Sequence, residues 1–205
     1  FKNGIIPDAE GIVSMEKFRN VKLLSEMTLA ELWQLFPIVL SEHDPAWENF
    51  YADEEKLLQK HFGKNAARIR HIGSTAVAGL IAKPTVDILL EVDEKSDVDM
   101  IRQLAIECGY SVMAETTVPE YRLDLCKGYT PLGFAEKVFH LHIRHFGDWD
   151  EPVFCEYLKQ HPDKAKEYAA LKTKLQKQFK HDRDAYTEAK GEFIRKCVKA
   201  ARNIK

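Results

Sequence analysis

Two segments of this sequence place polar residues where a ligand could be bound. In the first, a strand-like run ends in Gly73-Ser74-Thr75, where a glycine lets the backbone come close to a ligand and two hydroxyl groups are available. Free N–H groups and hydroxyls together suit a phosphate. The structural alternative is that Ser74 and Thr75 cap a helix, and the residues alone leave both interpretations open.

The second segment, Lys83 to Leu90, carries one acid inside an apolar strand. Asp87 faces one side of this strand, while Val86 and Ile88 face the other. A carboxylate in such surroundings is costly unless it is paired, hydrated or bound to a metal ion. Lys83 precedes the strand and could neutralise a phosphate or pair with Asp87. The alternative is that Asp87 only accepts hydrogen bonds from the loop.

A third strand carries two histidines. Along Val138 to Arg144 the residues alternate, so that His140 and His142 share one face with Arg144. Two imidazoles at positions i and i+2 can share a metal ion or contact a phosphate. Solvated histidines on a polar strand face are the alternative.

Two cations complete the set of candidates. Arg122 faces away from the apolar side of its strand, and its guanidinium could bind a phosphate or carboxylate or form an intramolecular salt bridge. Lys190 lies one helical turn after Tyr186, so both side chains can point to the same surface.

The elements that must position these residues follow a clear order: helix-strand alternation, then successive strands, then helices. This order favours the α+β class, with a mixed β-sheet flanked by helices, over a doubly wound parallel fold. The charge-rich helix from Pro162 to Lys180 is interpreted as a solvated face. Strands are expected at 38–40, 68–72, 85–92, 110–113, 121–126 and 138–144, and helices at 28–36, 45–62, 97–109, 152–160, 163–180 and 183–203.

The same pattern divides the chain into three parts. Residues 1–27 are expected to form an irregular N-terminal arm, since glycine and proline interrupt any periodicity near its start. Residues 28–150 would form the α+β core, and 151–205 would form C-terminal helices packed on it.

Composition narrows the classes of partner. The chain has 205 residues with 30 basic and 32 acidic side chains, which argues against a dedicated nucleic-acid binder. A small phosphorylated molecule or nucleotide remains compatible, because a few cations in a cleft suffice. No apolar run approaches the ~20 residues of a membrane span, and no secretory signal is recognisable. Four scattered cysteines fit a reducing compartment. We expect a cytoplasmic protein without a membrane partner, and the oligomeric state stays open.

Several motifs resemble those of a known family. The stretch H-I-G-S-T-A-V-A-G-L-I-A-K-P-T-V-D-I-L-L closely resembles the signature of the GrpB family. The segment His43 to Trp47, the strand around His140 and the tail between Tyr157 and Lys190 resemble it too. The resemblance runs from about Phe36 to the C-terminus. Because that family is similar in fold to nucleotidyltransferases, the resemblance implies a nucleotidyltransferase-like core.

The resemblance also implies an activity, the transfer of a nucleotidyl or other phosphoryl-containing group to an acceptor. Asp87 and Ser74 would then be catalytic, and Mg²⁺ or another divalent cation would be held by Asp87 with His140 and His142. The phosphates would be bound by Gly73, Ser74, Thr75, Lys83, Arg122 and Lys190.

One departure from the superfamily pattern puts the two-metal mechanism in doubt. Nucleotidyltransferases carry two carboxylates one residue apart on the second strand, but the residue two after Asp87 is Leu89. Glu91 shares the face yet lies ~13 Å further along the strand. Asp124 is the remaining candidate, and we predict that it does not reach Asp87, leaving one ion or none. The alternative function is therefore a non-catalytic binding protein for a nucleotide or phosphorylated metabolite.

Overall fold

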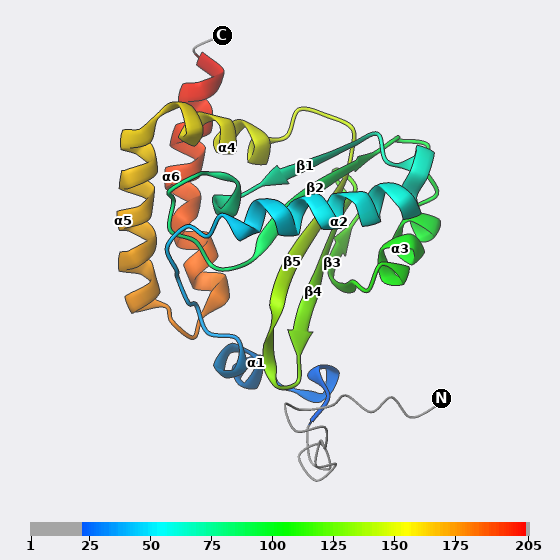
Figure 1. Ribbon diagram of the computed structural model, residues 1–205, viewed down its shortest axis with the longest axis horizontal. Coiled ribbons are helices and arrows are strands. Elements are labelled where there is room, and N and C mark those ends of the chain that lie inside the picture. Colours follow the sequence, from blue (N-terminus) through cyan, green and yellow to red (C-terminus); the bar gives the residue numbers. More distant parts are fainter. Residues whose placement is uncertain (1–21, 204–205) are drawn as a thin grey trace.

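The centre of the molecule is a five-stranded mixed sheet (Figure 1). The computed structural model describes residues 22–203. Strands lie in the order β1-β2-β5-β4-β3, with β2 and β5 parallel and all other neighbours antiparallel. The α+β class with a mixed sheet is therefore confirmed. The strands are β1 (Arg68–Ile72), β2 (Val86–Val92), β3 (Ser111–Thr116), β4 (Arg122–Thr130) and β5 (Gly133–His145).

One face of the sheet is apolar and forms the main core. Side chains alternate along each strand, so β2, β4 and β5 direct every second residue to this face. The helices α2 (Ala46–Phe62) and α3 (Val98–Glu107) cover it, and α2 crosses the sheet in Figure 1. The strand residues of this core are Val86, Ile88, Leu90, Val92, Leu123, Leu125, Phe139, Leu141 and Ile143.

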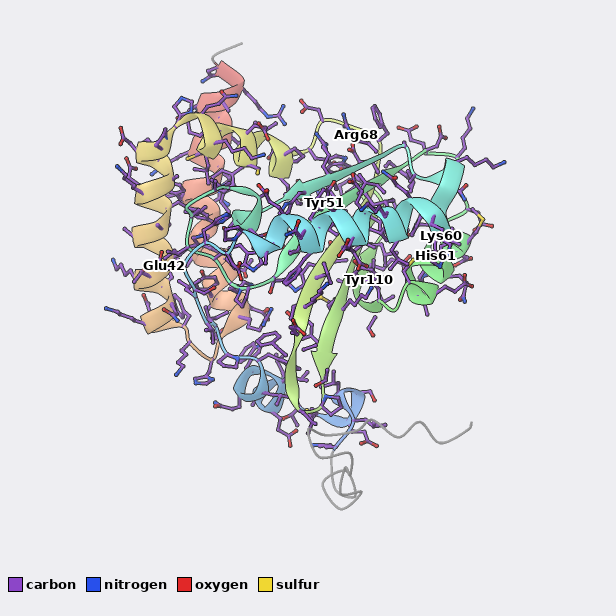
Figure 2. All side chains as sticks on the ribbon, viewed as in Figure 1. Glu42, Tyr51, Lys60, His61, Arg68 and Tyr110 are labelled. Carbon is purple, nitrogen blue, oxygen red and sulfur yellow. The ribbon has the colours of Figure 1, made fainter. Side chains whose placement is uncertain are left out.

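Local sequence signals begin α1 (Leu29–Leu35) and α2, and end α2, as predicted. Thr28 and Glu31 form a capping box at the start of α1. Asp44 accepts a hydrogen bond from the N–H of Ala46, at the start of α2. Gly63 ends α2 with a φ of 51°. Tyr51 of α2, labelled in Figure 2, stacks on His71 of β1 with ring centroids 4.8 Å apart.

The C-terminal helices form a second layer with a core of its own. They are α4 (Asp150–Gln160), α5 (Pro162–Gln178) and α6 (Arg183–Asn203), grouped beside the sheet in Figure 1. Phe154, Tyr168 and Val198 of these helices pack with Val77 and Leu80. Those two residues belong to the loop after β1, so this loop connects the sheet to the helical layer.

The short strand expected at 38–40 does not form. Ile38 is buried against Leu175 and Tyr186, and its N–H donates to the carbonyl of Lys180 at 2.8 Å. Val39 is 47% exposed. This apolar run therefore packs against the C-terminal helices through Ile38 instead of joining the sheet.

The two edge strands of the sheet, β1 and β3, differ in how far neighbouring elements cover them. β1 is contacted by α4, whereas all six residues of β3 are exposed. A β-bulge interrupts the pairing of β3 with β4 between Val112 and Ala114.

The predicted N-terminal arm lies mostly outside the described residues, which begin at Lys22. Within the remainder of the arm, Leu24–Glu26 forms a short 3-10 helix, η2. Among the helices of residues 22–203, none combines the length and the apolar composition that crossing a membrane requires.

Candidate functional site

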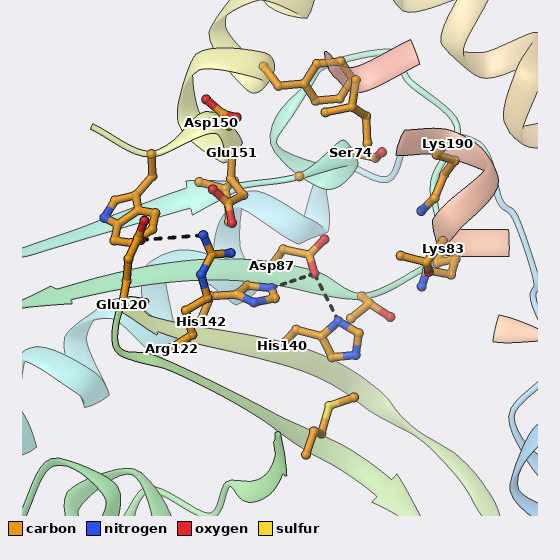
Figure 3. A pocket seen from close by; sticks show the side chains of 18 of the residues that line it. Ser74, Lys83, Asp87, Glu120, Arg122, His140, His142, Asp150, Glu151 and Lys190 are labelled. Carbon is orange, nitrogen blue, oxygen red and sulfur yellow. Dashed lines mark hydrogen bonds and ion pairs between the residues drawn. The ribbon is translucent and has the colours of Figure 1, made fainter. Parts of the chain in front are cut away.

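A large cleft lies between the polar face of the sheet and the helices α5 and α6 (Figure 3). Its volume is about 1050 Å³, at the upper end of the range for small-molecule sites. The residues predicted from the sequence that line this cleft are Gly73, Ser74, Lys83, Asp87, Arg122, His140, His142 and Lys190.

Asp87 stands at the middle of the cleft between two histidines. The strands β2 and β5 are parallel neighbours, and their register places Asp87 beside His140. Asp87 Oδ1 lies 3.2 Å from His140 Nδ1 and 3.7 Å from His142 Nε2 (Figure 3). Burial acts to raise the pKa of Asp87, but the hydrogen bonds to both histidines outweigh it and hold this pKa well below its ordinary value.

The outer nitrogen of His140 is held by a tyrosine. His140 Nε2 lies 2.9 Å from the hydroxyl of Tyr129 on β4, and Arg183 of α6 donates to that hydroxyl at 2.7 Å. Burial, as the largest effect, lowers the pKa of His140, although Asp87 opposes it. Contacts at both ring nitrogens therefore fix the orientation of the His140 imidazole.

The outer nitrogen of His142 is held by a carboxylate. His142 Nδ1 lies 2.7 Å from Asp124 Oδ1, and Arg144 donates to the same carboxylate at 2.6 Å. Burial disfavours the charged imidazole, but hydrogen bonds to Asp124 and Asp87 outweigh this and raise the pKa of His142 to about 9. Burial likewise opposes ionisation of Asp124, while His142 and Arg144 lower its pKa to about 2.

This arrangement explains how Asp124 is placed relative to Asp87. The imidazole of His142 stands between the two carboxylates, since one nitrogen faces each of them. Asp124 does not pair with Arg122, whose guanidinium lies 3.6 Å from Glu120. Arg122 also lies over the Trp149 ring, 5.2 Å from its centroid, at the far end of the cleft.

Gly73 makes room for Asp87. Its backbone, with φ 72° and ψ −168°, lies in a region that only glycine adopts readily. A Cβ added at Gly73 would overlap the Asp87 carboxylate. The sequence suggested that this glycine admits a ligand, but the nearest group it admits is a side chain of the protein.

The two hydroxyls after Gly73 differ in position. Ser74 lines the cleft, and its Oγ accepts a hydrogen bond from Lys172 Nζ at 2.9 Å. Thr75 is 1% exposed and is not among the lining residues. Its hydroxyl bonds to His71 and donates to the carbonyl of Thr85. The structure therefore places Thr75 outside the cleft lining, and its phosphate contact stays a prediction.

One end of the cleft is strongly basic. Lys83 and Lys190 lie over the ring of Tyr186, at 5.9 and 4.5 Å from its centroid, so Tyr186 and Lys190 do share a surface as predicted. Among the described residues, neither lysine has a hydrogen-bond or ion-pair partner. Burial, followed by repulsion between cations, lowers the pKa of Lys83 to about 7. Burial is also the main cause that lowers the pKa of Lys190 to about 8.

Three residues of this basic end were not predicted as site residues: Lys172, Arg183 and Tyr186. The helix that carries Lys172 was interpreted as a solvated face, yet Lys172 is 2% exposed, and burial lowers its pKa to about 7. Arg183 lies at the start of α6 and also lines the cleft. The sequence did contain a signal for Lys172 as a site residue, because Tyr168 and Lys172 repeat the four-residue spacing of Tyr186 and Lys190. In both pairs the ammonium lies over the ring.

Together these features define what the cleft can do. Uncompensated ammonium groups in a half-buried site favour an anionic ligand. The three ligand atoms offered by Asp87, His140 and His142 lie within 4.8 Å of one another, close enough to bind one metal ion. The cleft thus combines an anion-binding end with a candidate metal centre.

Comparisons with known proteins agree on one group of relatives. The family model described as GrpB protein matches residues 37–200. The chain is 30% identical to the glutamate-rich protein GrpB of Alkalihalophilus pseudofirmus, over 77% of this chain and 91% of that protein. It is 33% identical to a UPF0157 protein of Pseudomonas aeruginosa over 76% of this chain, but spans only 64% of that relative. The crystal structure of the conserved protein GrpB from Enterococcus faecalis superposes with a TM-score of 0.69 at 31% identity, covering 80% of this chain and 96% of that one.

Proposed function

Because this chain belongs to the GrpB family, we propose that its cleft binds a nucleotide and transfers a nucleotidyl or other phosphoryl-containing group from it to a small acceptor. The observation that carries this proposal is the unpaired basic end beside Asp87. Lys83 and Lys190 are partly buried, and no carboxylate within residues 22–203 is bound to them, an arrangement that costs stability and that an anionic ligand would relieve. The nucleotidyltransferase-like core that the sequence resemblance implies is consistent with this proposal.

The residues of the basic end have distinct tasks in this proposal. Lys83 and Lys190 bind phosphate oxygens, and Arg183, held by Tyr129, adds a further positive charge. Transfer of a phosphoryl-containing group moves negative charge onto the leaving phosphate, and cations fixed in advance stabilise that charge. Lys172 holds the Ser74 hydroxyl so that its proton can be donated to a phosphate oxygen.

Asp87, His140 and His142 supply the candidate metal centre. A divalent ion held there would polarise the transferred group. Gly73 and the two histidines hold the Asp87 carboxylate toward the cleft. Arg122, which lies at the opposite end from Lys83 and Lys190 in Figure 3, would contact the acceptor together with Trp149, whose ring it lies over.

A second function is favoured by one observation. Leu89, which stands where nucleotidyltransferases have a second carboxylate, is 0% exposed. Glu91 cannot replace that acid, because Arg68 and Arg70 bind it and it too is 0% exposed. The alternative is a non-catalytic protein that binds a nucleotide or phosphorylated metabolite.

The test is a binding and turnover assay with a panel of nucleoside triphosphates and acceptors. We expect the double variant Lys83→Met/Lys190→Met to weaken nucleotide binding about 10- to 100-fold, a free-energy loss of about 1.4 kcal/mol for each tenfold. Asp87→Asn should abolish release of phosphate or pyrophosphate while nucleotide still binds.

The control is Lys196→Met on the exposed side of α6, where Lys196 pairs with Glu192; it should bind and react as the parent does. Binding without turnover would support the second function. Nucleotide affinity unchanged in the double lysine variant would refute both.

A further inference from the structure

The metal-binding part of the site, on which the proposed function relies, has a donor set that differs from that of a magnesium enzyme. It offers two imidazole nitrogens and one carboxylate. Mg²⁺ demands octahedral coordination by oxygen and is usually bound through carboxylates and substrate phosphates. Imidazole ligands suit Zn²⁺, Fe²⁺, Ni²⁺ and other transition metals. The type of donor atom therefore argues against Mg²⁺.

The surroundings of the site also exclude a second ion of the usual kind. Leu89 occupies the position of the missing acid on β2 and is fully buried. Glu91 is bound by Arg68 at 2.5 Å and by Arg70 at 2.9 Å. Asp124 is bound by Arg144 and separated from Asp87 by His142. Asp87 is thus the one carboxylate among these that faces both histidines.

The outer contacts of the two histidines fix the orientation in which their imidazoles would bind a metal ion. Asp124 accepts from the Nδ1–H of His142, so a bound ion would displace only the proton that Nε2 shares with Asp87. The oxygen of Tyr129 accepts from Arg183 and contacts Nε2 of His140. With an ion bound, it could accept from the Nε2–H of His140, and the Nδ1 lone pair that faces Asp87 would be free to bind the ion. A carboxylate or other acceptor behind the ligand histidine is a recurring feature of metal sites, because it fixes the tautomer and the ring orientation.

We propose that Asp87, His140 and His142 bind a single transition-metal ion of the Zn²⁺, Co²⁺ or Fe²⁺ type in preference to Mg²⁺, and that Asp124 and Tyr129 are the positioning residues of this centre. Asp87 Oδ1, His140 Nδ1 and His142 Nε2 are the ligand atoms. The side of the ion away from β2 and β5 faces the cleft, where the phosphates of the proposed ligand would approach.

The first experiment measures metal binding on the full chain without nucleotide. After chelation and dialysis, Co²⁺ is titrated and the d–d absorption that follows imidazole coordination is recorded, and Zn²⁺ and Mg²⁺ then compete with it. We expect one Co²⁺ per chain, displacement by Zn²⁺, and no displacement by Mg²⁺ in large excess. Two ions per chain, or Mg²⁺ that displaces Co²⁺ at equal concentration, would overturn the proposal.

The second experiment tests the positioning residues. Replacing an outer partner typically costs 10- to 100-fold in metal affinity, so Asp124→Leu should lose about that much and Tyr129→Phe about tenfold. Asp124→Asn should lose less, since its amide oxygen can still accept from His142. Asp53→Asn, an exposed carboxylate on α2, is the matched control. Circular dichroism confirms that each variant is folded.

Equal Co²⁺ affinity and an unchanged absorption spectrum in folded Asp124→Leu would refute the positioning role. Co²⁺ affinity and the absorption spectrum are measured without nucleotide, so they do not depend on group transfer. If Co²⁺ binds as expected but no nucleotide reacts, the metal inference stands and the proposed transfer fails. If transfer occurs with Mg²⁺ alone and Co²⁺ does not bind, the proposed transfer stands and the metal inference fails.

Discussion

At the scale of single residues, the site depends on a close fit between Gly73 and Asp87. Gly73 has a positive φ, and a Cβ at this position would meet the Asp87 carboxylate. Two separate costs therefore follow from any side chain there. One is backbone strain of about 1–3 kcal/mol, and the other is displacement of the acid that lies between His140 and His142.

We predict that Gly73→Ala lowers the free energy of unfolding and also weakens metal binding. Gly79→Ala is the matched control, because Gly79 has a similar φ of 74° but its added Cβ would meet nothing within 4 Å. Urea denaturation should show a loss of about 1–3 kcal/mol in both variants, while Co²⁺ titration should show weaker binding only in Gly73→Ala. Equal metal binding in the two variants would show that Asp87 does not depend on Gly73.

At the same scale, the sequence revealed the acid and the histidines but not how they are linked. Asp87 was identified because a carboxylate in an apolar strand needs a partner, and His140 and His142 because they alternate with apolar residues. The contacts of Tyr129 with His140 and of Asp124 with His142 depend on strand register, which no local pattern encodes. The burial of Thr75 could not be predicted, because its hydrogen-bond partners His71 and Thr85 come together with it only in the folded chain.

At the scale of elements, α5 and α6 each bring a lysine to the cleft, and the local pattern assigned the helix of one of them, Lys172 on α5, to solvent. A helix rich in charge usually faces water, so Lys172 was not expected to be buried. Its burial follows from the loop between β1 and β2, whose Ser74 and Ile81 accept from its ammonium. Strands and long helices were mostly predicted correctly because periodicity defines them, whereas the run at 38–40 failed because three apolar residues carry too little periodicity to separate a strand from a buried connection.

The lysines of these helices should make stability depend on pH. The folded-state pKa values of Lys172 and Lys190 are lowered to about 7 and 8, below the ordinary value near 10.4. Between those values the unfolded chain binds more protons, so these groups cause the free energy of unfolding to rise with pH. In Lys172→Met/Lys190→Met this contribution is absent.

The double variant should therefore be stabilised relative to the parent more at about pH 6.5 than at about pH 9.5. Urea denaturation at both pH values measures this, and contributions from His142 cancel in the difference. Lys174→Met/Lys196→Met, which alters exposed positions on the same two helices, should show no such trend. A difference between variant and parent that does not change with pH would contradict the lowered pKa values.

At the scale of the whole molecule, the cleft separates two hydrophobic cores. One core joins α2 and α3 to the sheet, and the other joins α4, α5 and α6 to the loop after β1. Polar groups from both layers line the space between them. A ligand that bridges Asp87 of the sheet and Lys190 of α6 would tie the layers together.

We expect pyrophosphate, as a probe of the basic end, to slow amide hydrogen exchange in α6 and in β5 near His140. Exchange in α3, on the far face of the sheet, should stay unchanged and serves as the internal control. Mass spectrometry of peptides with and without saturating pyrophosphate measures the effect. Protection in α3 equal to that in α6 would indicate a general effect of salt, and no protection in α6 would count against a bridging ligand.

The bulge between Val112 and Ala114 affects the tendency of copies of this protein to aggregate through the edge strand β3. An edge strand with unpaired N–H and C=O groups is a template onto which another chain can add, and long flat edges are sites of aggregation. The strand β3 presents such an edge with exposed Val112 and Met113. Its bulge breaks the regular spacing of hydrogen-bonding groups, and Glu115 adds a charge that a matching strand would have to accommodate. The irregularity therefore protects the molecule against edge-to-edge polymerisation, at the end of the sheet farthest from β1.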